Sequence, residues 1–149
     1  RIKLRKDPLN ESPIADLGFD PLLEMPPRRR FADLLGRRTG TMKGVLMDQS
    51  FAAGVGNWIA DEVLYQAGID PRRRANTLDA EEIEAVRKAL RAIVRKAVAV
   101  DAEKKRFPRD WLFHDRWGKN AQARTHAGEA IEFVTVGGRT TAWVPARQR

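Results

Sequence analysis

The most regular hydrophobic pattern in the chain lies between residues 80 and 100. Apolar residues recur there at spacings of three and four, which places them on one face of an α-helix. They are Ile83, Val86, Leu90, Ile93, Val94 and Ala97. Asp79 precedes this face, and Glu82 lies three positions after Asp79. This spacing is the pattern of a capping box. The sequence therefore predicts a helix from about Ala80 to Val100, with Pro108 beyond its end.

Three shorter segments precede this helix. Residues 28–38 carry apolar side chains at helical spacing, and residues 45–47 form a short apolar run that a core could bury. Residues 57–66 also have helical spacing. Gly68 and Pro71 end this last helix, because glycine commonly closes a helix C-terminus and proline cannot continue one.

The pattern changes after Trp111. Residues 129–136 are rich in β-branched and aromatic side chains, and residues 139–145 form a similar run after Gly137 and Gly138. Two such runs joined by Gly-Gly predict an antiparallel β-hairpin with a tight turn. The predicted fold class is therefore mainly α with a small β appendage.

These patterns divide the chain into three parts. Residues 1–27 are irregular and interrupted by prolines, and we predict a linker that ends a preceding domain, or a wrapping segment whose Leu17, Leu22 and Leu23 dock on a core. Residues 28–110 are predicted to form a helical domain. Residues 111–149 are predicted to form the β-hairpin with its approach segment.

Net charge indicates an anionic partner. The 149 residues carry a net charge of +8 at pH 7, and nucleic acid is the usual partner of so basic a chain. A basic surface that only aids solubility is the alternative. The chain has no cysteine, and His114 and His126 lack a suitable carboxylate spacing, so neither a metal nor a cofactor is predicted. No apolar run approaches the ~20 residues of a membrane span, so no membrane is expected as a partner.

Two glycines and an asparagine stand where the helix at residue 57 begins. Gly54 and Gly56 let the backbone turn with its N–H groups exposed. The start of the helix directs free N–H groups and the positive end of its dipole toward the same point. These residues are therefore predicted to bind a phosphate, with the amide of Asn57 as a further donor. The alternative is that Asn57 is only the N-cap of the helix.

The stretch from Met42 to Pro71 resembles the helix–two-turn–helix motif of the formamidopyrimidine-DNA glycosylase and endonuclease VIII family. The shared positions are Lys43, Asp48, Gln49, the Gly-Val-Gly-Asn run, Ala60-Asp61-Glu62 and the closing Ala67-Gly68-Ile69-x-Pro71. The resemblance implies that Asn57 binds backbone phosphate beside a DNA lesion and that Lys43 approaches the DNA nearby. Asp61 and Glu62 are interpreted as structural acids, which favour the helix dipole or pair within the domain, rather than as catalytic groups.

The predicted hairpin places Arg139 directly after its Gly-Gly turn. A guanidinium at a projecting tip is suited to phosphate contact or to insertion into a minor groove, and a solvated arginine is the alternative. The family ends in a hairpin finger, usually held by four cysteines on zinc, whose tip arginine grips DNA. Residues 131–145 resemble that hairpin without its cysteines, as in the zincless-finger branch with its plant and fungal members. Phe133 and Trp143 are then expected to pack where zinc would lie.

Three further cations are candidate phosphate contacts. Arg116 and Lys119 lie in residues 113–124, which resemble the family's approach to the finger. Arg72 follows the helix pair and belongs to an arginine triplet. An ordinary basic residue in a solvated loop is the alternative in each case.

The resemblance covers about Leu17 to Arg147 and implies the DNA-binding half of a DNA glycosylase and AP lyase acting on formamidopyrimidines and other oxidised purines. Family enzymes attack the sugar with an N-terminal proline, and this chain begins with Arg1. The chain alone is therefore expected to bind double-stranded DNA with oxidised bases or abasic sites, as a monomer, without cutting it. The expected location is nuclear in a eukaryote and cytoplasmic in a bacterium. A stand-alone module for structured RNA or DNA, and a protein-interaction scaffold, are the alternatives.

Overall fold

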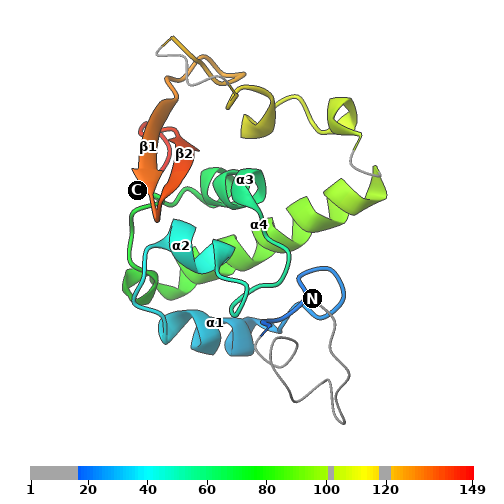
Figure 1. Cartoon of the computed structure of the whole chain (residues 1–149), viewed down its shortest axis with the longest axis vertical. Coiled ribbons are helices and arrows are strands. Elements are labelled where there is room, and N and C mark those ends of the chain that lie inside the picture. Colours follow the sequence, from blue (N-terminus) through cyan, green and yellow to red (C-terminus); the bar gives the residue numbers. More distant parts are fainter. Residues whose placement is uncertain (1–16, 101–102, 118–121) are drawn as a thin grey trace.

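In the described residues, four α-helices form a body that is followed by a two-stranded antiparallel sheet (Figure 1). The computed structural model describes residues 17–100, 103–117 and 122–149. The main elements are α1 (Arg28–Gly36), α2 (Met42–Met47), α3 (Asn57–Ala67), α4 (Ala80–Ala99), β1 (Glu132–Val136) and β2 (Arg139–Trp143). Short 3-10 helices are η2 (Ala75–Thr77), η3 (Lys104–Arg106) and η4 (Leu112–His114). The predicted class, mainly α with a small β appendage, is confirmed.

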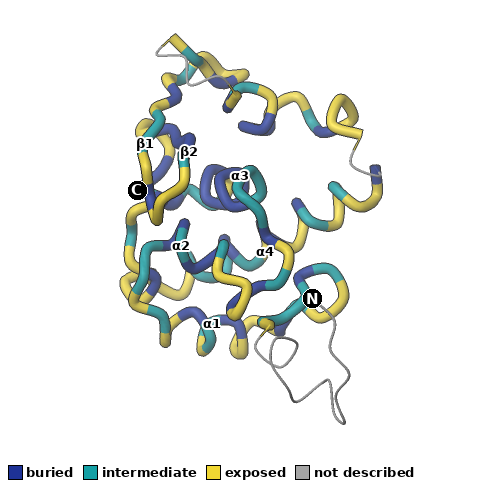
Figure 2. The backbone as a smooth tube through the Cα atoms, viewed as in Figure 1, coloured by how far each residue is buried: buried dark blue, intermediate teal, exposed yellow. Residues whose placement is uncertain are grey.

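Helix α4 begins with the capping box that the sequence indicates. The Asp79 carboxylate accepts a hydrogen bond from the Glu82 N–H at 2.8 Å, and the Glu82 carboxylate accepts one from the Asp79 N–H at 2.9 Å. The apolar face of α4 packs against α1 and α3. Figure 2 shows buried positions concentrated in α3 and on the inner sides of α1 and α4. No helix in the described part is both long enough and apolar enough to cross a membrane.

Helices α2 and α3 are joined by two tight turns over residues 48–56. The predicted apolar run at residues 45–47 is the second half of α2, and the side chain of Thr41 caps this helix by accepting from the Gly44 N–H at 3.2 Å. Gly68 has a φ of +76° and closes α3, as the sequence predicted. Residues 42–67 therefore form a helix, two turns and a helix.

Residues 17–27 pack onto the helical body. Phe19, Phe31 and Phe51 meet edge to face, with ring centroids 5.2 to 5.9 Å apart. The backbone of Phe19 also bridges to Ala52, two residues before Gly54. This part of the predicted linker therefore supports the turn that precedes α3.

The hairpin has the tight turn expected from Gly137 and Gly138. Both residues have positive φ, +59° and +78°, which the twist of a two-residue hairpin requires. The register pairs Val136 with Arg139, so Arg139 is the first residue after the turn. Strand β1 begins at Glu132, three residues later than the predicted run. One face of the hairpin packs on α3 through a cluster formed by Tyr65, Leu112, Ile131, Ala142 and Val144.

The expectation that Phe133 and Trp143 fill one position is wrong. Phe133 pairs with Ala142, and Trp143 pairs with Glu132. Because neighbouring residues of a strand point to opposite faces, the two rings lie on opposite faces of the hairpin. Phe133 packs against the cluster on α3, whereas the Trp143 ring is covered by the guanidinium of Arg72.

Candidate nucleic-acid interface

The turn before α3 leaves the start of this helix open. Gly54 has a φ of +82°, which favours glycine, and Gly56 is the N-cap without a side-chain capping bond. Asn57 is the first helical residue, so its interpretation as a simple N-cap is wrong. The backbone N–H groups of residues 57–59 have no partner within the described residues. They are the free donors of a helix N-terminus.

Gln49 holds this turn in shape. Its amide oxygen accepts a hydrogen bond from the Gly54 N–H at 2.7 Å, and its amide nitrogen donates to the carbonyls of Met47 and Val55 at 3.1 and 3.4 Å. One side chain thus bridges the end of α2 and the approach to α3. The sequence motif contains Gln49, but this bracing role depends on a turn geometry that spacing alone does not give.

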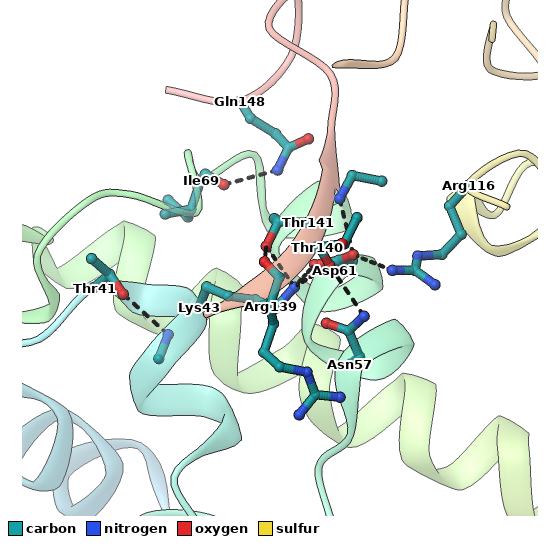
Figure 3. Close-up of polar contacts among 12 residues, drawn as sticks. Thr41, Lys43, Asn57, Asp61, Ile69, Arg116, Arg139, Thr140, Thr141 and Gln148 are labelled. Atoms are coloured by element: carbon teal, nitrogen blue, oxygen red, sulfur yellow. Dashed lines mark hydrogen bonds and ion pairs between the residues drawn. The ribbon is translucent and has the colours of Figure 1, made fainter. Parts of the chain in front are cut away.

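Asn57 joins α3 to the hairpin. Its amide nitrogen donates to the carbonyl of Thr140 at 3.1 Å, and its buried amide oxygen has no partner within the described residues. Thr140 directly follows Arg139, so the amide of Asn57 and the guanidinium of Arg139 lie at the same end of α3 (Figure 3). The structure therefore brings together two predicted site residues that are 82 positions apart in the chain.

Behind these two side chains lies a buried cluster of charges. One Asp61 oxygen is 2.5 Å from the Lys43 ammonium, and the other is 2.6 Å from the Arg116 guanidinium. Side-chain exposure is 1% for Lys43, 0% for Asp61 and 6% for Arg116. Burial lowers the pKa of Lys43, the Asp61 carboxylate opposes this, and the charges of Arg116 and Arg139 reinforce it.

This burial corrects the role expected for Lys43 and Arg116. Both were expected to approach the DNA, but both cationic ends are buried against Asp61. Their two charges exceed the single charge of Asp61, so the cluster leaves positive potential beneath the surface where Asn57 and Arg139 lie. A hollow of about 250 Å³ lies beside it, between α2 and the hairpin turn. Its lining residues are Lys43, Gly44, Met47, Asp48, Val136, Gly137 and Arg139.

Arg72 does not lie at the start of α3 with Asn57 and Arg139. Its guanidinium donates to both Asp70 oxygens, at 3.0 and 2.8 Å, and stacks on Trp143 with 4.4 Å between the guanidinium carbon and the ring centroid. Trp143 ends β2, so this contact is at the end of the hairpin opposite to its turn. The other predicted contact, Lys119, lies outside the described residues.

Glu62 has a structural position, as its place early in the helix led us to expect. Its buried carboxylate accepts hydrogen bonds from the N–H groups of Leu112 and Phe113 at 3.1 and 2.7 Å, and from the Gln66 amide at 2.9 Å. Burial raises the pKa of Glu62 to about 7, although these hydrogen bonds favour its charged form. Glu62 thus fastens η4, which leads to the hairpin, onto α3.

The residues present do not fit the zinc that usually holds the family's finger. The chain has no cysteine, and no group of three or more histidines and carboxylates in the described residues is placed to hold a metal. Hydrogen bonds close the turn before β1 instead. The N–H of Thr125 donates to the Glu129 carbonyl at 2.8 Å, and the N–H of Glu129 donates to the Thr125 hydroxyl at 3.1 Å.

The turn before α3 gives a first testable prediction. Gly54→Ala should lower the free energy of unfolding by about 1 kcal/mol, because the positive φ is strained for alanine, while the added Cβ would meet no atom within 4 Å beyond the adjacent residues of the chain. Gly36→Ala is the matched control: Gly36 lies in α1 with open space around it, so alanine should stabilise by roughly 0.5–1 kcal/mol. Urea denaturation measures both changes. Equal effects of the two substitutions would contradict the strain at Gly54.

Two domain families match this chain. Residues 17–108 match the sequence model of the formamidopyrimidine-DNA glycosylase H2TH domain, and residues 111–145 match that of the formamidopyrimidine-DNA glycosylase-like C-terminal domain. A formamidopyrimidine-DNA glycosylase of Arabidopsis thaliana is 44% identical over 100% of this chain and 38% of its own length. One of Nitratidesulfovibrio vulgaris is 37% identical over 90% of this chain and 38% of its own length.

Solved structures agree with the sequence matches. Lactococcus lactis Fpg in complex with abasic-site DNA superposes with a TM-score of 0.75 at 25% identity, covering 90% of this chain and 52% of that one. MutM in complex with DNA containing carbocyclic 8-oxo-G also gives a TM-score of 0.75, at 27% identity over 90% of this chain and 51% of that one. The chain spans about half or less of the length of these relatives. It belongs to the formamidopyrimidine-DNA glycosylase family, of which it contains the helix–two-turn–helix and the C-terminal finger.

Proposed function

We propose that these residues are the DNA-binding half of a DNA glycosylase and AP lyase that excises oxidised bases from double-stranded DNA. The observation that carries the proposal is the open N-terminus of α3 beside the tip of the hairpin, which places Asn57 and Arg139 at the same end of α3. The relatives support the substrate class, since their solved complexes contain abasic-site DNA or DNA with an oxidised guanine.

The donors at this place suit a DNA phosphate. The N–H groups of residues 57–59 and the helix dipole favour an anion at the start of α3. One N–H of the Asn57 amide is used by Thr140, which leaves the second one for a phosphate oxygen. Arg139 can hold a phosphate through two parallel hydrogen bonds, and the buried charges behind it strengthen the positive field.

The same chemistry argues for binding without cleavage. The groups at the site are an amide, a guanidinium and backbone N–H groups, all of which donate hydrogen bonds and none of which is a nucleophile at neutral pH. We therefore expect the chain alone to bind a damaged duplex as a monomer and to leave its strands intact. The alternative of a module for structured RNA is not favoured by the relatives, whose solved complexes contain DNA.

Fluorescence anisotropy on three duplexes tests this function. One duplex carries a stable abasic-site analogue, one is undamaged DNA, and one is double-stranded RNA, each measured over a salt series. We expect the tightest binding to the abasic duplex, with a salt dependence that corresponds to several phosphates and no cleavage products on a denaturing gel. Equal affinity for all three would indicate a generic basic module and would contradict the proposal.

Asn57→Ala should weaken binding to the abasic duplex by ~1–3 kcal/mol, roughly 5- to 150-fold, because it removes a donor to the phosphate. Asn76→Ala is the matched control, since Asn76 is an exposed asparagine in η2, away from the start of α3. The control should bind as the parent chain does. A folded Asn57→Ala variant with unchanged affinity would remove Asn57 from the site.

A further inference from the structure

The carboxylate of Asp61 is the meeting point of four segments. It lies on α3 and is fully buried. Besides pairing with Lys43 of α2 and Arg116 of the segment after η4, it accepts a hydrogen bond from the Ala142 N–H of β2 at 3.1 Å. One side chain therefore ties the hairpin to both helices of the helix–two-turn–helix unit.

Lys43 extends this connection toward the tip of the hairpin. Its ammonium donates to the Thr141 hydroxyl at 2.8 Å and to the Thr140 carbonyl at 3.4 Å (Figure 3). Together with the bond from Asp61 to Ala142, these contacts fix three consecutive residues of β2. Those residues directly follow Arg139, whose own side chain has no partner within the described residues.

The hairpin depends on such anchoring. An isolated two-stranded hairpin is marginally stable, and the turn at residues 137–138 is exposed glycine that buries no side chain. The anchor in turn depends on Asp61, because Lys43 and Arg116 are buried cations that share this single carboxylate. Without it, two charges would stay buried and uncompensated.

We propose that Asp61 is a positioning residue for DNA binding. It does not touch the DNA; it holds β2 against α2 and α3, so that Arg139 and Asn57 reach the backbone together. A hairpin tip that is ordered before binding loses less conformational entropy when the complex forms. Its affinity for DNA is therefore higher. This role rests on the proposed DNA-binding function of the hairpin tip.

A double-mutant cycle with Arg139→Ala tests the proposal. In the parent chain, Arg139→Ala should weaken binding to the abasic duplex by at least about tenfold. In an Asp61→Asn background the same substitution should cost less than about threefold, because a tip that is no longer held gains little from its arginine. Amide hydrogen exchange should become faster at residues 140–142 and stay unchanged in the core of α4.

Thr141→Val provides a milder variant in case Asp61→Asn does not fold. Valine keeps the shape of threonine and leaves the Lys43–Asp61–Arg116 charges in place, but it removes the hydroxyl that accepts from the Lys43 ammonium and donates to the Arg139 carbonyl at 3.1 Å. Like Asp61→Asn, Thr141→Val should make amide exchange at β2 faster and should reduce the affinity lost on Arg139→Ala. Both changes should be smaller than in the Asp61→Asn variant. Val86→Ala is the control: it opens a fully buried position of α4, and its effect should add to that of Arg139→Ala.

The outcomes separate this role from the proposed function. Normal binding with additive effects of Asp61→Asn and Arg139→Ala overturns the positioning role and leaves DNA binding standing. Faster amide exchange at β2, together with additive effects of Asp61→Asn and Arg139→Ala on binding, would mean that Asp61 contributes to stability alone. This outcome also overturns the positioning role. A parent chain that does not bind the abasic duplex overturns the proposed function, and the positioning role with it.

Discussion

Arg139→Glu is expected to lower the affinity for an abasic-site duplex by about 100-fold or more, because a carboxylate at the hairpin tip repels the phosphate that the guanidinium attracts. Arg139 is exposed and its side chain has no partner within the described part of the chain, so the fold should not change. The salt dependence of binding should also fall by about one phosphate contact. Anisotropy over a salt series measures both effects, and thermal unfolding verifies the fold.

The control for this prediction is Arg91→Glu. Arg91 lies on the exposed side of α4, forms no ion pair among the described residues, and undergoes the same change in charge. It alters only the overall field of the molecule, so binding should weaken by no more than a few-fold. Equal losses for the two variants would show that Arg139 is one element of a diffuse basic surface and not a specific contact.

Local patterns in the sequence predicted the elements that position the site. The capping box and the apolar face defined α4 to within one residue, and Gly137-Gly138 gave the hairpin turn, because these signals act between neighbouring residues. The phosphate-binding role predicted for Asn57 comes from the family motif around it and stays a prediction. The structure adds that Asn57 and Arg139 lie together, which no local pattern contains.

The errors concern contacts between distant parts of the chain. Lys43 and Arg116 were expected at the DNA because the segments that contain them resemble the family's DNA-binding motif and its approach to the finger. Their common partner, Asp61, is 18 residues from Lys43 and 55 from Arg116, so only the fold shows that the three charges are buried together. Residues 17–27 were predicted as a linker or a wrapping segment from their prolines, and the sequence did not identify Phe31 and Phe51 as the partners of Phe19, because they lie far along the chain.

One error could have been avoided from the sequence. The Gly-Gly turn sets the register, and the register pairs Phe133 with Ala142 and Glu132 with Trp143. Strand periodicity then places Phe133 and Trp143 on opposite faces. The expectation rested on the aromatic character of the two residues and on the family's zinc. Their positions in the strands already excluded that both rings fill one position on the same face of the hairpin.

Glu62 should make the protein less stable as the pH rises through neutrality. Its pKa is raised from 4.5 to about 7 in the folded state, so the folded chain favours the protonated form. The stability linked to that proton is fully present below pH 4.5 and is lost as the pH rises through 7. Glu62→Gln remains neutral, so the free energy of unfolding of the parent chain should fall by about 2–3 kcal/mol relative to the variant between about pH 5 and 8.

The change with pH, and not the difference at one pH, is the informative quantity. The glutamine side chain in the Glu62→Gln variant has one carbonyl oxygen for the N–H groups of Leu112 and Phe113, so the variant has a cost of its own, but that cost does not depend on pH. Glu81→Gln is the control, because it makes the same carboxylate-to-amide change at an exposed position in the first turn of α4. A difference for Glu62→Gln that does not vary with pH would mean that the Glu62 carboxylate stays charged throughout, held by its three hydrogen bonds against the cost of burial. The segment η4 would then be held on α3 by a charged Glu62 whose hydrogen bonds to Leu112 and Phe113 do not change near neutral pH.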